Sequence, residues 1–168
     1  LGVLLDLDLG CQPVLLIADV PTPALDVTVL ALVLHLLKQV CRERGTALML
    51  ITHDMGVIAR MCDRVAVMYA GRVVEYTDVR TLFRRPAHPY AAGLLRSLPR
   101  LGGNARRLAT IEGQPPRLTR LPPGCAYAPR CPRAEARCRE VAPELVKLRD
   151  GHEVRCHFPI DRPAEAAA

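Results

Sequence analysis

The densest group of metal-binding residue types lies near the end of the chain. Four cysteines there follow the spacing C-x5-C-x6-C-x17-C, among glycines, prolines and arginines. They are Cys125, Cys131, Cys138 and Cys156. Four thiolates suit either tetrahedral zinc or a [4Fe–4S] cluster. The spacing differs from the CxxC pairs of zinc ribbons, so four reduced thiols packing a small lobe is the alternative. His152 and His157 flank the last cysteine and are possible substitute ligands.

A second candidate site begins at Asp19, which follows an uninterrupted apolar run over 14–18. Such a run predicts a strand buried on both faces, as in a parallel sheet, or simply a core strand. Asp19 would then lie at the carboxyl end of the strand, where open α/β sheets bind their ligands. A carboxylate at that place commonly holds magnesium against nucleotide phosphates.

The elements that must position Asp19 are a helix and a second strand. Apolar residues recur every three or four positions over 26–44, which predicts a helix that Asp26 caps and Gly45 ends. Residues 46–52 predict a second buried strand, so 14–52 reads as a parallel βαβ unit. His53 follows that second strand and would lie beside Asp19 if the two strands are neighbours.

Shorter elements follow. We expect a helix over 55–62, a hairpin over 64–77 turning at Ala70-Gly71, a helix that Asp78 caps, and a helix that begins at Pro89. Glycines, prolines and arginines over 100–123 indicate a linker. The predicted organisation is therefore a first domain over 11–99, that linker, a cysteine-rich module over 124–160 and a disordered tail over 161–168.

Composition narrows the function classes. The chain has 168 residues, seven cysteines and a net charge of +6, and residues 1–10 lack the basic flank of a signal peptide. Cysteines in such a chain indicate a reducing compartment. Residues 80–139 contain thirteen arginines and no lysine, but few aromatics. We interpret this stretch as a solvated basic face and expect no nucleic-acid partner.

Several stretches together resemble the second half of an ATP-binding cassette (ABC) ATPase. They are VLLIADVPTPALD (14–26), LMLITHD (48–54), DRVAVMYAGRVVE (63–75), HPY (88–90) and the cysteine pattern. The last three narrow the resemblance to the ATPase subunits of oligopeptide/dipeptide importers. The resemblance makes Asp19 the Mg/ATP-associated Walker B aspartate and His53 the switch histidine. The D-loop would be Ala24, Leu25 and Asp26. In some relatives the four cysteines hold an iron–sulfur cluster, which favours a cluster over zinc.

The chain departs from that family at the catalytic parts. Its only lysines are Lys38 and Lys147, so no glycine–lysine phosphate loop exists, and the signature loop LSGGQ is absent as well. Val20 stands where the family has the glutamate that acts as general base. Whether the chain is an enzyme therefore stays open, and we expect no ATP hydrolysis by the chain alone.

The sequence thus predicts an α/β fold: the C-terminal half of a P-loop-type ABC ATPase, with a parallel βαβ unit, a β-hairpin, helices and a small cysteine-rich lobe. The function implied is that of a truncated or degenerate ATP-binding subunit of a peptide importer. Intact relatives use MgATP and work with a second ATPase subunit and with permease subunits at the inner face of the plasma membrane. The alternative is a non-enzymatic metal-binding or interaction module derived from such a subunit.

Overall fold

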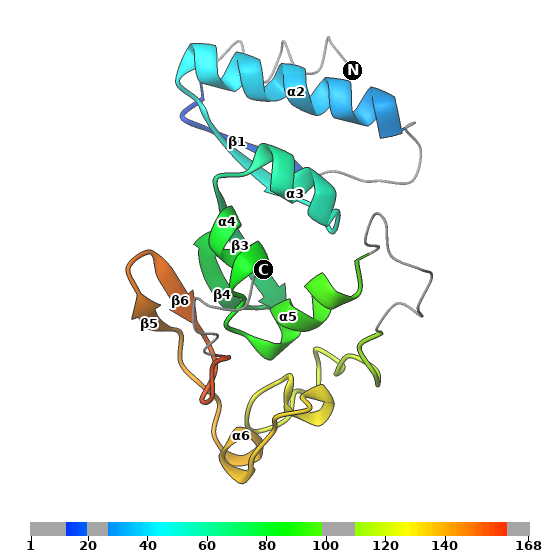
Figure 1. Ribbon diagram of the computed structural model, residues 1–168, viewed down its shortest axis with the longest axis vertical. Coiled ribbons are helices and arrows are strands. Elements are labelled where there is room, and N and C mark those ends of the chain that lie inside the picture. Colours follow the sequence, from blue (N-terminus) through cyan, green and yellow to red (C-terminus); the bar gives the residue numbers. More distant parts are fainter. Residues whose placement is uncertain (1–12, 20–26, 99–109, 161–168) are drawn as a thin grey trace. The chain divides into compact units, whose positions relative to one another are not determined.

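The computed structural model describes residues 13–19, 27–98 and 110–160, with the backbone alone for 27–31 (Figure 1). The chain divides into two compact units, Leu1–Cys62 and Asp63–Ala168. Within the described ranges, no helix has the length and apolar character needed to cross a membrane.

The first unit is built on a strand–helix–strand repeat. Strand β1 (Leu15–Asp19) precedes helix α2 (Val27–Arg44), which leads to strand β2 (Ala47–Ile51). The two strands pair in parallel, from Leu15 opposite Ala47 to Asp19 opposite Ile51. The predicted parallel βαβ unit is therefore confirmed.

Helix α2 ends through its backbone. Gly45 has φ +69°, a left-handed conformation that glycine adopts without a steric cost. The Gly45 amide donates to the Arg42 carbonyl, and the Thr46 amide donates to the Cys41 carbonyl at 2.9 Å. This pair of bonds satisfies carbonyls that would otherwise lack partners at the helix end. It also turns the chain directly into β2.

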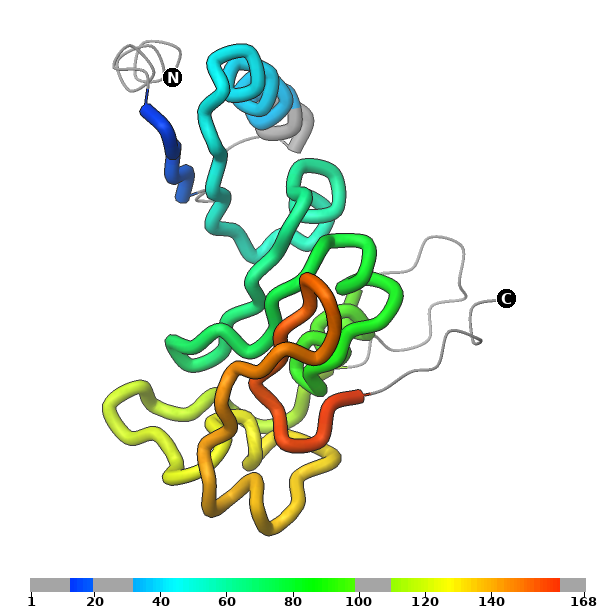
Figure 2. Tube along the Cα trace, turned by 90° about the vertical axis from the view of Figure 1, so that its left-hand side faces the viewer, coloured from blue at the N-terminus to red at the C-terminus, as the bar shows by residue number. Residues whose placement is uncertain are grey.

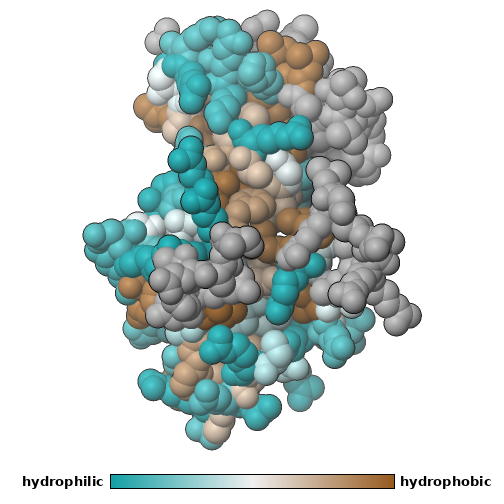
Figure 3. All heavy atoms as spheres, in the orientation of Figure 1, coloured by the Kyte–Doolittle hydropathy of each residue, from teal (hydrophilic) through white to brown (hydrophobic). Residues whose placement is uncertain are grey.

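One face of the two-stranded sheet packs on α2, where Leu37 and Cys41 are buried against residues of both strands. The opposite face is open: Ile17 is 58% exposed and Met49 is 50% exposed. The prediction that both strands are buried on both faces is wrong for the described residues. An apolar run shows that a strand is hydrophobic but not how many layers cover it, and here the described residues supply one layer. Hydrophobic and hydrophilic residues accordingly lie side by side at the surface of this unit (Figure 3).

Helix α3 (Met55–Met61) completes the first unit. The Asp54 carboxylate caps it by accepting from the Gly56 amide at 2.7 Å and from the Val57 amide. The Lys38 ammonium on α2 donates to the Met61 carbonyl at 2.7 Å. The segment that follows His53 is therefore tied to the helix that covers the sheet.

The second unit begins with the predicted hairpin. Strands β3 (Arg64–Tyr69) and β4 (Arg72–Asp78) are antiparallel, and Ala70 and Gly71 both have positive φ. Two successive positive φ values are typical of a type I′ turn, whose twist matches that of the strands. Helix α4 (Val79–Arg84) is capped by Asp78, as predicted, and helix α5 (Pro89–Arg96) begins at Pro89.

Residues from the C-terminal part of the chain extend the hairpin sheet. After the short helices η1 (Ala128–Arg130) and α6 (Ala136–Glu140) come strands β5 (Val146–Arg149) and β6 (His152–Val154). Strand β6 pairs with β4, so the sheet order is β3-β4-β6-β5. Figure 2 shows the orange and red C-terminal part of the trace against the green segments of this unit. The fold is thus mixed α/β, with one parallel and one antiparallel sheet among the described residues. The predicted module boundaries at 99 and 124 stay a prediction.

Candidate functional site

The carboxyl end of the parallel sheet brings two predicted site residues to one edge. Asp19 is the last residue of β1 and lies opposite Ile51, the last residue of β2. His53 follows Ile51 by two residues, and both Asp19 and His53 are exposed. Because parallel strands end at the same edge, the pairing supports the expected proximity of these two residues. The other residues predicted for this edge, Val20 and the D-loop residues 24–26, lie outside the described part of the chain.

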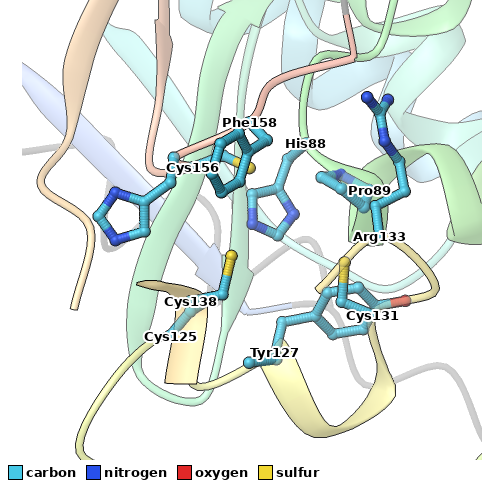
Figure 4. Close-up of a pocket in the computed structure, with 11 residues that line it drawn as sticks. His88, Pro89, Cys125, Tyr127, Cys131, Arg133, Cys138, Cys156 and Phe158 are labelled. Carbon is cyan, nitrogen blue, oxygen red and sulfur yellow. The ribbon is translucent and has the colours of Figure 1, made fainter. Parts of the chain in front are cut away.

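The four predicted cysteines line one pocket in the second unit, which we call the cysteine pocket (Figure 4). It encloses about 340 Å³ that is partly open to solvent. Its walls also contain His88, Pro89, Tyr127, Arg133, His157 and Phe158, with Ala128. Figure 4 shows the sulfur atoms of Cys131, Cys138 and Cys156 on the side of the pocket where the His88 ring lies. None of the described cysteines forms a disulfide.

A close backbone crossing brings two of these cysteines together. The Cys125 amide donates to the Cys138 carbonyl at 2.7 Å. Gly124 passes so close to this carbonyl that a Cβ atom would collide with it and would lie 2.6 Å from the carbonyl carbon of Arg139. Only glycine allows this approach, so Gly124 determines how Cys125 meets helix α6.

His88 and Pro89, in the corner between α4 and α5, form another part of the wall of the pocket. His88 is 1% exposed, and its Nδ1 accepts from the Tyr90 amide at 3.0 Å, which caps α5. Burial lowers the pKa of His88 to about 4, and a hydrogen bond to the backbone of Arg155 acts in the opposite direction. The ring is therefore neutral at physiological pH. Since Nδ1 accepts, the proton lies on Nε2.

A buried carboxylate holds this corner in place. Glu75 on β4 is fully buried, and its two oxygens accept from the amides of Ala87 and His88, each at 2.8 Å. His152 Nε2 lies 2.8 Å from Glu75 Oε1. A buried carboxylate needs such partners, because burying it unpaired would lower the free energy of unfolding by roughly several kcal/mol. Glu75 therefore ties β4, β6 and the corner together.

Burial favours the protonated form of three thiols of the pocket. Burial raises the pKa of Cys125 and Cys131, and it raises the pKa of Cys156 to about 11. Repulsion from Cys125, Cys131 and Cys138 adds to the shift at Cys156. That repulsion is itself a sign that the four sulfurs share one neighbourhood. A metal would have to displace these protons.

The donor set fits a thiolate-bound metal in residue type, but the described side chains do not form a preformed metal site. Four sulfurs around one pocket are the ligands that zinc and iron–sulfur clusters require. Among the described residues, however, no three cysteine, histidine or acidic side chains already form a group able to hold an ion. Metal binding would therefore need the pocket to close around it.

The two histidines considered as substitute ligands have different positions. His157 lines the cysteine pocket, and its Nε2 lies 2.9 Å from the Val141 carbonyl oxygen. His152 does not line the pocket and is committed to Glu75. His152 thus helps to hold Glu75, which in turn holds the corner. Its position near Cys156 in the sequence did not indicate this role.

Sequence reasoning also missed Glu75 and Gly124. Glu75 lies in a β-rich run where a charged residue normally faces solvent, and its partners are 12, 13 and 77 residues away in the chain. Gly124 was noted only as part of a cysteine-rich motif. The glycine directly before the candidate ligand Cys125 is the one sequence signal that could have indicated a close approach between two backbone segments.

The mixed α/β fold is compatible with the C-terminal portion of an ABC ATPase, and comparison with known proteins supports this class. The family described as "Oligopeptide/dipeptide transporter, C-terminal region" matches residues 74–138. The oligopeptide transport ATP-binding protein OppD of Haemophilus influenzae is 49% identical over 160 residues, covering 95% of this chain and 49% of the relative. AppD of Bacillus subtilis, with the same description, is 47% identical over 97% of this chain and 50% of its own length.

A dipeptide transport protein is similar over the same share of this chain. The dipeptide transport ATP-binding protein DppD of Escherichia coli is 44% identical over 95% of this chain and 49% of its own length. The chain spans about half the length of these curated relatives. Over residues 74–138 the chain matches the C-terminal region of the oligopeptide/dipeptide transporter family, and over most of its length it is similar to ATP-binding proteins of such transporters.

Proposed function

We propose that the chain serves as the C-terminal part of an ATP-binding subunit that drives import of oligopeptides or dipeptides. The observation that carries the proposal is the parallel pairing of β1 and β2, which ends with Asp19 opposite Ile51, two residues before His53. In this role Asp19 associates with magnesium and ATP, and His53 contacts the γ-phosphate. Residues 24–26, which lie outside the described part of the chain, would be the D-loop.

The 168 residues of this chain supply only some of the catalytic parts of such a subunit. A phosphate-binding loop with its lysine, the signature loop and a general base are all required to bind and hydrolyse MgATP. Val20 has no group that accepts a proton. The chain alone is therefore expected to show no hydrolysis above background, and activity would need the first half of such a subunit. Its partners would be a second ATP-binding subunit and the permease subunits that hold it at the cytoplasmic face of the membrane.

We further propose that the cysteine pocket holds one metal centre, an iron–sulfur cluster in preference to zinc. Cys125, Cys131, Cys138 and Cys156 would supply the thiolates, and the preference follows from the family resemblance. The centre would stabilise the segments that it joins, because metal-binding free energy becomes folding free energy. This module would be 124–160, following a first domain over 11–99 and a linker over 100–123, and the predicted tail over 161–168 lies outside the described residues.

A chimera tests the nucleotide role. The half of Haemophilus influenzae OppD that matches this chain is replaced by residues 11–168, and ATP hydrolysis is measured. Val20→Glu should raise turnover about 100-fold, the usual contribution of a positioned base. Asp19→Asn and His53→Ala in the Val20→Glu background should each abolish the gain, whereas Glu43→Gln on the exposed surface of α2 should not.

Two results would count against the proposal. If Val20→Glu did not raise ATP turnover in a chimera that folds and binds ATP, Val20 would not occupy the position of the general base. If ATP turnover in the Val20→Glu background were the same with Asp19 and with Asp19→Asn, Asp19 would not be the residue that associates with magnesium. Metal in the purified chain, combined with no nucleotide affinity in the chimera, would favour the alternative of a non-enzymatic metal-binding module.

A further inference from the structure

A second pocket of the second unit is lined by two arginines and by apolar side chains. It encloses about 510 Å³ that is partly open to solvent. Its wall contains Arg72 and Arg155 and no acidic side chain, so we call it the arginine pocket. Much of the remaining wall is apolar or aromatic: Val74, Leu121, Pro122, Pro123, Tyr127 and Pro143. A cavity of this size, with apolar walls and a few polar groups, is typical of sites for small molecules.

The guanidinium group of Arg155 is held in place by the backbone around it. Its Nε donates to the Val73 carbonyl at 2.9 Å, and its Nη1 donates to the Pro143 carbonyl at 3.2 Å. These bonds use two of the five N–H donors of the group, and no acceptor among the described residues pairs with the other three. A cation that is already immobilised loses little side-chain entropy when it binds an anion.

Arg72 contributes a second positive charge to the same cavity. It is the first residue of β4 and is exposed, and its guanidinium group has no hydrogen-bond or ion-pair partner among the described residues. Two cations on one cavity repel each other, and an anion bound between them removes that repulsion. Guanidinium groups suit carboxylates in particular, because their planar fork of donors matches the two carboxylate oxygens.

The rest of the wall limits what else the occupant can carry. Apart from the two arginines, none of the residues that line the pocket is charged. Proline has no backbone N–H to donate, and Pro122, Pro123 and Pro143 all lie in this wall. A second charged group on the occupant would therefore be desolvated without a partner, whereas an apolar group would be well accommodated. The wall thus favours one negative charge attached to an apolar body.

We propose that the arginine pocket binds a small monocarboxylate with an aromatic or branched aliphatic body. Arg155 binds the carboxylate through its unused donors, and the exposed Arg72 adds a second positive charge. The apolar wall, with Leu121 and the Tyr127 ring, contacts the body of the ligand. This binding does not depend on the nucleotide role or on the metal centre, because it uses neither the sheet edge nor a thiolate.

Three probes separate the two features of the ligand. Phenylacetate has the charge and the ring, phenylacetamide has the same shape without the charge, and acetate has the charge without the ring. Their dissociation constants are measured by isothermal titration calorimetry on the full chain. Phenylacetate should bind at least about tenfold more tightly than either of the others, because one charge-assisted hydrogen bond or one buried ring is worth that ratio.

Matched variants locate the site. Arg155→Met should weaken phenylacetate binding about tenfold or more, and Arg72→Met about threefold, as expected for an exposed charge. Arg80→Met, at an exposed arginine outside the pocket wall, should leave the affinity unchanged. Leu121→Ser should weaken binding about threefold, whereas Leu118→Ser, which removes an exposed leucine outside the wall, should not.

The possible results are decisive in either direction. Equal affinities for phenylacetate and phenylacetamide would overturn the proposal, because the arginines would then recognise no charge. Equal weakening by Arg72→Met and Arg80→Met would also overturn it, since the net positive charge of the chain would explain the attraction. A phenylacetate dissociation constant above about 10 mM would have the same consequence. If Arg155→Met fails to fold, the two pairs of variants at exposed positions decide.

Discussion

Removal of the buried carboxylate at Glu75 is the sharpest test of what holds the second unit together. Glu75 accepts three hydrogen bonds at 2.8 Å while fully buried, from two backbone amides and from His152. Glu75→Leu removes every acceptor and leaves three donors without partners. Glu75→Gln keeps the volume but replaces one acceptor oxygen by an NH2 group that faces another donor.

The expected losses follow from the number of donors left unpaired. An unsatisfied buried donor costs about 1–3 kcal/mol, so Glu75→Gln should lower the free energy of unfolding by about 2 kcal/mol. Glu75→Leu should lower it by about 3–5 kcal/mol, the range measured when one partner of a buried pair is removed. That loss is a large part of the total stability of a small domain.

Tyrosine fluorescence during urea denaturation reports on this unit alone. The chain has four tyrosines and no tryptophan. Tyr69, Tyr90 and Tyr127 form one cluster with ring centroids 4.6–5.4 Å apart, and Tyr76 lies on β4. For a slope of about 1–2 kcal/mol per molar, Glu75→Gln should move the midpoint down by about 1–2 M. Glu140→Gln, at an exposed position on α6, is the control. A Glu75→Leu midpoint equal to that of the control would refute the reasoning.

Three further predictions concern single residues. Gly124→Ala should cost about 1–3 kcal/mol in the same urea assay, because its Cβ would lie 2.6 Å from the carbonyl carbon of Arg139; an unchanged midpoint would contradict this. The pKa of His88, lowered to about 4 by burial, keeps the native ring neutral while the unfolded ring binds a proton below about pH 6.5. The unfolding free energy should therefore fall by up to about 3 kcal/mol between about pH 6.5 and pH 4, and His88→Gln should flatten that slope. The exposed sheet face should make the isolated chain associate, so Ile17→Lys should lower the sedimentation-average mass and Val141→Lys, at another exposed apolar residue, should not.

Local chemistry decided which parts of the fold could be predicted. The hairpin turn, the Asp78 cap and the start of α5 at Pro89 depend on residues that act on their nearest neighbours, and each was predicted within about two residues. The parallel pairing of β1 with β2 followed from the connecting helix, whose apolar period is also a local signal.

The parts that could not be predicted depend on distant partners. Glu75 is a charged residue in a strand, and only the fold shows that it meets Ala87, His88 and His152 in the core. The attachment of β6 to β4 is of the same kind, because its pairs join residues about eighty positions apart. The cysteine set was predicted from residue type, but the division of the pocket between the corner and the lobe needed coordinates.

The two candidate sites place different demands on the rest of the protein. Among the described residues, the edge that carries Asp19 and His53 belongs to a two-stranded sheet with one exposed apolar face, and a parallel sheet of this kind is normally covered on both sides. The cysteine pocket is lined entirely by residues of the second unit, whose buried carboxylate and histidines are already paired with one another. A metal centre should therefore form in this chain alone, whereas nucleotide chemistry at the sheet edge should appear only when further polypeptide covers the bare face. If the chain alone bound MgATP but no metal at the cysteine pocket, the opposite would hold: the sheet edge would function in this chain alone and the cysteine pocket would not.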